Sequence, residues 1–331
     1  MNLGLAIIFR LLVLLSIALL VVGLVKPRWV WPWKNKEPDR PAIMMVAALL
    51  FMGAFTGLGE TAQDAVGDDL EHQLGAQILS KAEYRIGPDT RRCAAGARPG
   101  QAGATDDEET PDGIRYNVRT PVNYDATVAH PLLMVYAPHG KNRNRNEQFT
   151  YLTRDATAAG FIIAYVDHRR MAPEALIELA GIPRHIQEKW CVDENRILLT
   201  GHSDGGTISM GIAFVNGTRD IPAAIVSSAV GIRADDLADR SCPKPLSVLV
   251  MHSSKDTVFP GYGKGTVEWW AKCNECDGRA VEALPNGCVA YSGCANGVKT
   301  WYCENSNPHS VWPSLNRTVI GFLSTAVRSQ E

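Results

Sequence analysis

Apolar and polar positions divide the chain into a strongly hydrophobic beginning and a longer region of short apolar runs. In that longer region, 113–331, the apolar runs alternate with turn signals and with stretches of helical periodicity. The runs expected to form buried strands are 114–119, 131–136, 161–166, 196–200, 223–229, 246–251 and 298–302. Helices are expected at 183–190, 207–214 and 314–327, and a further one is expected to end at 160. Because strands that alternate with helices form a mostly parallel sheet covered on both faces, we predict an α/β domain.

The hydrophobic beginning, 1–58, contains two apolar runs, 3–25 and 42–58, on either side of a basic linker, 26–41. The first run is long enough to cross a bilayer as a helix, and the second is close to the minimum length. Basic linkers stay in the cytoplasm, and the three tryptophans of this linker suit a membrane interface. We therefore predict a two-helix membrane hairpin whose two ends face away from the cytoplasm. The alternatives are the apolar part of a cleaved signal peptide for the second run, or a buried core helix for either run.

Between these regions, residues 59–112 are rich in alanine, glycine and acidic residues, with four consecutive acids at 106–109. This composition predicts a linker or a loosely packed lead-in to the α/β domain. A helix near 65–82 and an attachment through Cys93 are the ordered features expected there. We assign this segment no chemistry.

The composition limits the classes of partner. The 331 residues are 46% hydrophobic and 21% charged, with a formal net charge of −2. This length allows one domain of roughly 200–250 residues with appendages. The balanced charge does not favour a nucleic-acid partner.

The eight cysteines indicate the redox environment. An even number, clustered late in the chain, predicts disulfide bonds and hence an oxidising compartment. The alternative is a zinc site, because Cys273 and Cys276 form a C-x-x-C pair, although Cys288 and Cys294 are poorly spaced as its second half. The pairing of the cysteines stays open. With the membrane hairpin, the cysteines predict an α/β domain outside the cytoplasm, on the periplasmic side of the inner membrane if the cell is Gram-negative.

A Gly-x-Ser-x-Gly motif at 201–205 follows the expected strand 196–200 and precedes the expected helix 207–214. This is the context of the nucleophile elbow in α/β hydrolases, where a sharp turn lifts a serine clear of the sheet. The glycines leave room for a strained serine backbone and for close packing of helix and strand. We predict that Ser203 is a catalytic nucleophile. The alternative is a glycine-rich turn whose serine caps the helix.

A nucleophilic serine needs a general base, and an acid that orients this base. In α/β hydrolases these residues follow in the order serine, acid, histidine. His309 fits that order, whereas His252 lies at the end of the expected strand 246–251, before any acid in the loop that follows. Asp256, in the loop after the strand 246–251, is the predicted acid and would hold the tautomer of His309. The alternative for His309 is a histidine of a loop, and the alternative for Asp256 is an ordinary turn residue. The other acids nearby, in 235–239, are expected to be solvated.

An oxyanion hole requires two backbone donors. One donor is predicted to be the backbone N–H of Asp204, the residue after the serine. The side-chain carboxylate of Asp204 is expected to act as an acid in the first turn of the helix. The other is the N–H of Gly140 or Lys141, in the turn after the strand 131–136. The charges that follow, up to Arg145, could attract an anionic substrate, although most such runs are simply solvated.

These motifs together resemble the feruloyl esterase and poly(3-hydroxybutyrate) depolymerase-like family of α/β hydrolases. The resemblance runs from about Tyr116 to the end, roughly two thirds of the chain. It rests on the segments 160–165, 191–196, 201–206, the loop of Asp256, 291–294 and 309–313. It implies an α/β-hydrolase fold and secreted ester hydrolysis, with Ser203, Asp256 and His309 as the catalytic triad.

The chain departs from that family at three positions. Asn307 and Pro308 stand where the family usually has two glycines, and Lys141 stands where it usually has a small residue or a cysteine. We predict a serine esterase that acts through an acyl-enzyme on feruloyl, acetyl or polyhydroxyalkanoate-type esters, with no metal or organic cofactor. Its expected partners are a small or polymeric ester substrate and a membrane, through the two apolar runs. The alternatives are a serine peptidase or acyltransferase on the same triad, or a catalytically silent envelope-binding module.

Overall fold

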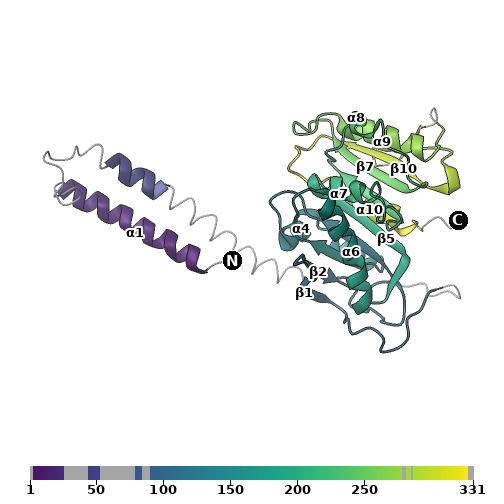
Figure 1. Ribbon diagram of the computed structural model, residues 1–331, viewed down its shortest axis with the longest axis horizontal. Helices are drawn as coiled ribbons and strands as arrows, with labels where there is room; N and C mark the ends of the chain where they lie inside the picture. Colours follow the sequence, from purple (N-terminus) through teal and green to yellow (C-terminus); the bar gives the residue numbers. More distant parts are fainter. Residues whose placement is uncertain are drawn as a thin grey trace. The chain divides into compact units, whose positions relative to one another are not determined.

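The structure is a computed structural model that describes residues 3–25, 44–52, 79–83, 90–277, 281–284 and 286–326. The chain separates into two compact units, Met1–Gln73 and Leu74–Glu331. Figure 1 shows helix α1 in the first unit, and a sheet with its covering helices in the second.

In the first unit, α1 (Leu3–Val25) is a continuous helix, and the described part of the second apolar run, 44–52, is also helical. Among the described residues, no helix is both long and apolar enough to cross a membrane. The predicted two-helix membrane hairpin is therefore not supported. The basic linker 26–41 lies outside the described residues.

The second unit is built on one ten-stranded sheet. Its strands are β1 (Ala104–Glu109), β2 (Arg115–Arg119), β3 (His130–Tyr136), β4 (Ile162–Val166), β5 (Val192–His202), β6 (Ala224–Ser228), β7 (Ser247–Ser253), β8 (Val281–Ala283), β9 (Cys288–Tyr291) and β10 (Thr300–Asn305). They lie in the order β1-β2-β4-β3-β5-β6-β7-β10-β9-β8. From β4 to β10 each strand is parallel to its neighbours in the sheet. At the two sides, β1 and β2, and β9 and β8, pair antiparallel with their neighbours. This mostly parallel sheet fits the predicted α/β-hydrolase fold.

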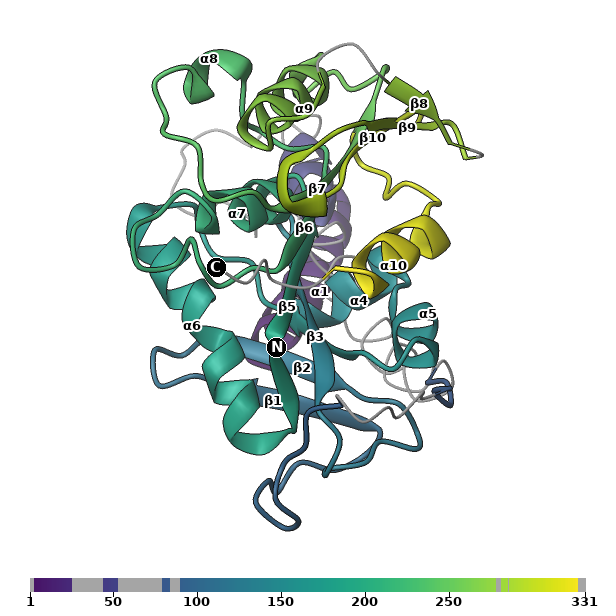
Figure 2. The ribbon, with the colours of Figure 1, turned by 90° about the vertical axis from the view of Figure 1, so that its right-hand side faces the viewer.

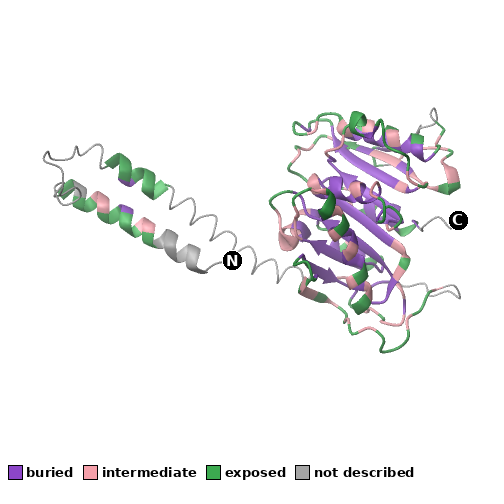
Figure 3. Cartoon of the chain, in the orientation of Figure 1, coloured by how far each residue is buried: buried purple, intermediate pink, exposed green. Residues whose placement is uncertain are grey.

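Helices cover both faces of this sheet (Figure 2). They are α4 (Arg143–Thr150), α5 (Thr153–Ala158), α6 (Pro173–Lys189), α7 (Asp204–Ile212), α8 (Ala234–Leu237), α9 (Tyr262–Cys273), the 3-10 helix η1 (Ala295–Gly297) and α10 (Asn316–Ser324). Successive strand residues enter opposite cores: Leu132 and Met134 of β3 join the core with α6, α7 and α9. Leu133 and Val135 join the core with α5 and α10. Because both faces are covered, β3 is buried along its length and is apolar after His130. Figure 3 shows that the central strands are buried in the same way.

Residues 104–109, expected to belong to a linker, form the edge strand β1 against β2. The ladder to β2 and an ion pair between Asp106 and the buried Arg119, at 2.7 Å, hold this acidic segment in place. Charged side chains also suit an edge strand, because they oppose pairing with other chains. The helix expected near 65–82 lies mostly outside the described residues.

All eight cysteines form disulfides, as expected, and disulfides are typical of proteins in an oxidising compartment. The bonds are Cys93–Cys191, Cys242–Cys273, Cys276–Cys294 and Cys288–Cys303. Cys273 and Cys276, the two members of the C-x-x-C pair, belong to different bonds, so the zinc alternative for the cysteines is wrong. Cys93 attaches the segment before β1 to the start of β5, as expected.

Candidate functional site

Ser203 lies at the turn between the end of β5 and the start of α7. Its backbone has φ 54° and ψ −118°, a conformation that is rare for a residue with a side chain. Such a conformation costs of the order of 1–3 kcal/mol and persists only where the surrounding structure enforces it. Here the N–H of Ser203 donates to the carbonyl of Ser228, on the neighbouring strand β6, at 2.9 Å. The strand, turn and helix of a nucleophile elbow are therefore present.

Three glycines allow α7 to pack closely against the sheet at this turn. A Cβ atom on Gly205 would lie 2.0 Å from the carbonyl oxygen of Tyr136 in β3. A Cβ on Gly201 would lie 2.4 Å from the carbonyl carbon of Gly205, and one on Gly206 would lie 2.7 Å from the Ser228 oxygen. All of these neighbours are backbone atoms, which cannot rotate away. The close approach of helix and strand requires glycine here, as predicted for Gly201 and Gly205.

Gly205→Ala is expected to lower the free energy of unfolding by on the order of 3 kcal/mol, because the new methyl group would push α7 away from β3. Urea denaturation measures this loss. The matched control is Gly181→Ala in α6, where an added Cβ meets no atom within 4 Å. Alanine should stabilise that helix position by up to about 1 kcal/mol. Equal stability of the two variants would contradict the close-packing argument.

His309 joins Ser203 to Asp256 through two hydrogen bonds. Its Nε2 lies 3.0 Å from Ser203 Oγ, and its Nδ1 lies 2.7 Å from Asp256 Oδ2. Asp256 follows β7 and His309 follows β10, and these strands are parallel neighbours whose loops emerge at the same edge of the sheet as the elbow. The Asp256 side chain is fully buried, and that of His309 is 16% exposed. The structure thus brings together the three residues that chain order indicated.

The surroundings of Asp256 keep its carboxylate ionised. Burial alone would raise its pKa, but the hydrogen bond with His309 and those from the N–H groups of Phe259 and Val258 bring the pKa below its ordinary value. The two backbone bonds reach Oδ1 at 2.8 Å each. An ionised carboxylate accepts the Nδ1–H of His309, which leaves Nε2 to accept the hydroxyl proton of Ser203. This is the tautomer that a general base needs.

His252, the other histidine near the acid, has a different set of contacts. Its Nε2 lies 2.8 Å from the carbonyl oxygen of Phe259 and 3.9 Å from Asp256 Oδ2. Gly263 of α9 packs against its ring, where a Cβ would lie 2.3 Å from the Cβ of His252. His252 therefore supports the loop that carries the acid.

His202, which precedes the serine, holds the loop that carries His309. Its Nε2 lies 2.6 Å from the backbone oxygen of His309, and its Nδ1 lies 3.0 Å from Ser228 Oγ. Because a carbonyl oxygen can only accept, Nε2 carries the proton and Nδ1 accepts from the serine hydroxyl. Burial lowers the pKa of His202 to about 4, so its ring is neutral at neutral pH. Its position inside the motif was the only signal of this role in the sequence.

The neutral His202 is expected to make folding sensitive to acid. Its folded-state pKa of about 4 lies below the ordinary value of about 6.5, so the unfolded chain binds the proton first as the pH falls. Above about pH 6.5 the neutral His202 makes its full contribution to the free energy of unfolding. This contribution, about 3 kcal/mol, is lost as the pH falls from about 6.5 through about 4. Burial also lowers the pKa of His130 and of His252, which act in the same direction.

Urea denaturation of wild type and His202→Gln at about pH 7 and about pH 4 tests this expectation. Between these two pH values, the free energy of unfolding should fall by about 3 kcal/mol more in wild type than in the variant, because glutamine does not titrate. His185→Gln, at a partly exposed position on α6, is the matched control. Equal losses in wild type and His202→Gln would contradict a neutral, buried His202.

The predicted oxyanion donors lie on two segments beside Ser203. Asp204 is the first residue of α7, where backbone N–H groups have no partner within the helix. In the turn after β3, the N–H of Lys141 donates to the carbonyl of Pro138 at 3.2 Å. Gly140 has φ 76°, which glycine adopts without strain. Because the Lys141 N–H closes a turn, Gly140 is the better candidate of the two loop positions.

The cationic run after Gly140 begins α4 and is paired with neighbouring groups. Arg143 is 12% exposed and binds Asp167 at 3.2 Å, and it also pairs with Asp107 of β1. The ammonium group of Lys141 lies 4.8 Å from the ring centre of Phe149. These contacts do not support an open cationic rim that attracts an anionic substrate.

Among the described residues, three metal-ligating side chains gather beside the elbow: His139, His168 and Asp204. The Asp204 carboxylate lies 3.0 Å from His168 Nε2. Asp256, and not this carboxylate, is the acid that contacts His309.

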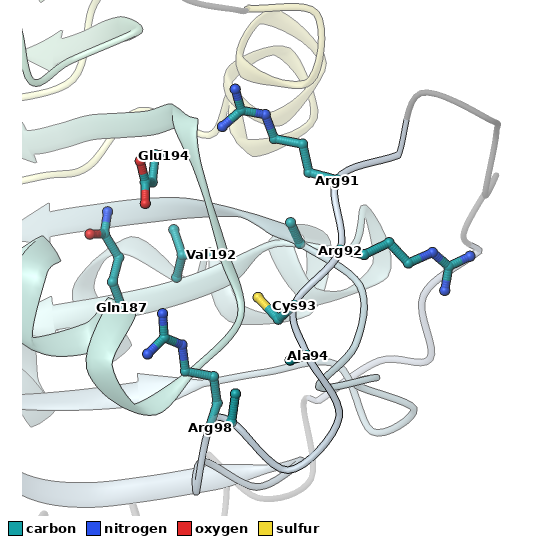
Figure 4. A pocket seen from close by; sticks show the side chains of 10 residues that line it. Arg91, Arg92, Cys93, Ala94, Arg98, Gln187, Val192 and Glu194 are labelled. Carbon is teal, nitrogen blue, oxygen red and sulfur yellow. The ribbon is translucent and has the colours of Figure 1, made fainter.

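A separate cavity of about 400 Å³ lies at the opposite end of β5 (Figure 4). Cys93, Arg98, Val192 and Glu194 are among its lining residues. Because β5 begins at Val192 and Ser203 follows its last residue, the cavity and the serine lie at opposite edges of the sheet. The cavity has no part in the triad.

Comparisons with known proteins found structural similarity. No protein-family model matches the sequence, and no curated protein matches it. Similar solved structures include an acetyl xylan esterase from Aspergillus awamori, with 12% identity, 67% of this chain and 100% of that chain covered, and a TM-score of 0.49. A feruloyl esterase module from Clostridium thermocellum has 14% identity, 76% and 96% coverage, and a TM-score of 0.49. An S-formylglutathione hydrolase from Staphylococcus aureus has 13% identity, 67% and 98% coverage, and a TM-score of 0.48.

Proposed function

We propose that this protein is a serine hydrolase of carboxylic esters that acts through an acyl-enzyme. The observation that carries the proposal is the pair of hydrogen bonds from Asp256 through His309 to Ser203, of 2.7 and 3.0 Å. A serine hydroxyl is a weak nucleophile by itself, and this arrangement removes its proton as it attacks. The strained elbow, which presents the serine at the start of α7, supports the same role.

In the proposed reaction, Ser203 Oγ attacks the ester carbonyl carbon while His309 Nε2 takes the hydroxyl proton. The backbone N–H groups of Asp204 and Gly140 donate to the resulting oxyanion, and each is worth roughly 3–4 kcal/mol in such sites. His309 then gives its proton to the alcohol as the C–O bond breaks, which leaves Ser203 acylated. A water molecule, deprotonated by His309, hydrolyses the acyl-enzyme. Asp256 stays ionised and stabilises the imidazolium.

The proposed substrates are feruloyl, acetyl or polyhydroxyalkanoate-type esters, in small molecules or in polymers. This choice follows the resemblance of the sequence motifs to the feruloyl esterase and polyhydroxybutyrate depolymerase-like family. Four disulfides indicate an oxidising compartment. We therefore propose that hydrolysis takes place outside the cytoplasm.

The test uses the purified full chain with its disulfides intact. It should hydrolyse p-nitrophenyl acetate and butyrate, and a panel of ethyl ferulate, acetylated xylan and poly(3-hydroxybutyrate) then ranks the acyl groups. Diisopropyl fluorophosphate, which phosphorylates activated serines, should abolish hydrolysis, and peptide mass spectrometry should find the adduct on Ser203. No hydrolysis of any ester and no adduct would overturn the proposal in favour of a silent binding module.

The same preparation separates ester hydrolysis from the other activities of such a triad. Peptide p-nitroanilides report peptidase activity, and an added alcohol acceptor reports acyl transfer through the new ester that forms. An adduct on Ser203 together with faster cleavage of anilides than of esters would replace the esterase proposal with a peptidase.

A further inference from the structure

Three side chains from three different segments meet beside the elbow. His139 lies in the turn after β3, His168 lies just after β4, and Asp204 is the first residue of α7. The Asp204 Oδ2 atom is 3.0 Å from His168 Nε2 and 3.9 Å from His139 Nδ1. The three ligand atoms all lie within 4.8 Å of one another. The imidazole rings of the two histidines meet edge to face, with their centres 5.1 Å apart.

We propose that His139, His168 and Asp204 form a binding site for a divalent transition-metal ion of the zinc class. Two imidazole nitrogens and one carboxylate oxygen are a ligand set that suits zinc and its neighbours, and they leave a position open for water. Ligand atoms in a tetrahedral zinc site lie about 3.4 Å apart. The His168–Asp204 separation is already within that spacing. The His139 side chain is 85% exposed, so it can rotate towards the other two ligands.

Four of the other described histidines already make hydrogen bonds within the protein. The rings of His130, His202, His252 and His309 each bind backbone or side-chain atoms of the protein. All eight cysteines are in disulfides, so no thiolate competes for the ion.

The backbone around the site holds two of its loops together. The N–H of His168 donates to the carbonyl of Lys141 at 3.3 Å, which joins the loop after β4 to the turn that carries His139. A bound ion would connect both loops to the start of α7. It would thereby restrain the spacing between Gly140 and Asp204, the two proposed oxyanion donors. This inference goes beyond the proposed hydrolysis, which needs no ion.

The test measures zinc binding directly, on full chain purified without a polyhistidine tag and stripped with a chelator. Isothermal titration with ZnCl₂ should find one ion per chain. His139→Ala and His168→Ala should each weaken zinc binding by at least about tenfold. Even residues that only hydrogen-bond to a metal ligand change metal affinity by about 10–100-fold, so the loss of a ligand should have at least that effect. His185→Ala, which removes a histidine on α6 near Glu188, is the matched control and should bind as wild type does.

Far-UV circular dichroism checks that each variant is folded, and His168→Gln replaces His168→Ala if the alanine variant is not. Cobalt(II) provides a second readout, because its visible absorption reports bound nitrogen and oxygen ligands. This absorption should disappear in both ligand variants and persist in His185→Ala. The absence of a bound ion in wild type would overturn the proposal, as would equal affinity in wild type and both variants. Weakening by only one of the two substitutions would contradict a three-ligand site.

Discussion

Ser203→Ala is expected to lower kcat for p-nitrophenyl acetate by about 10⁶-fold. Alanine removes the Oγ atom that lies 3.0 Å from His309 Nε2, so no nucleophile remains at the turn. The oxyanion donors and the substrate contacts remain, and they account for a residual acceleration of roughly 10³–10⁴ over water in such enzymes. Steady-state release of p-nitrophenol measures the loss, with active-site titration of wild type as the reference.

Two further variants make this expectation specific. Ser254→Ala removes an exposed hydroxyl in the loop of the acid, which donates to the Asn305 carbonyl, and this variant should keep wild-type kcat. His309→Ala should lower kcat about as much as Ser203→Ala does. The double variant should lower kcat little further, because the two residues act as a unit. A Ser203→Ala protein with kcat within about tenfold of wild type would rule out Ser203 as the nucleophile.

Asp256→Asn is expected to lower kcat by about 10⁴-fold while the protein stays folded. Asparagine can keep the oxygen that accepts the N–H groups of Val258 and Phe259, so the loop should retain its turn. Its amide nitrogen would then face His309 Nδ1 in place of Oδ2. Because that nitrogen donates, Nδ1 would become an acceptor and Nε2 would carry the proton. The ring could then no longer take the proton of Ser203.

The matched control for this variant is Asp235→Asn, which changes an exposed acid in α8 and should leave kcat unchanged. Thermal denaturation of both variants separates a loss of catalysis from a loss of folding. If Asp256→Asn kept more than about a tenth of wild-type kcat, Asp256 would not be the residue that orients His309.

Local signals in the sequence identify the candidate nucleophile. The apolar strand, the glycine pattern at 201–205 and the following helix are contiguous, so one short window contains the whole elbow. Chain order then points to Asp256 and His309, because loops that follow neighbouring parallel strands emerge at one edge of the sheet. The central strands were also predictable, since strands covered on both faces are apolar at successive positions.

The limits of some elements depend on contacts that a local pattern does not contain. Pro183 suggests the start of a helix, but α6 begins at Pro173 and continues through Pro183. The buried side chains of Leu179 and Ile182 hold this helix against the sheet, and that packing outweighs the local cost of an interior proline. The acidic segment 104–109 likewise forms a strand only because β2 offers it a ladder.

By itself the sequence determined the strands β2 to β7 and β10, which turn carries the serine and which loops could supply the acid and the histidine. The tertiary structure alone decided which distant groups meet. It separated Cys273 from Cys276 into different disulfides, and it placed His202 against the carbonyl of His309, 107 residues later in the chain. The physical reason is that backbone preferences and burial patterns are properties of short windows. Contacts between distant segments depend on sheet register and on the paths of the loops, which no single window contains.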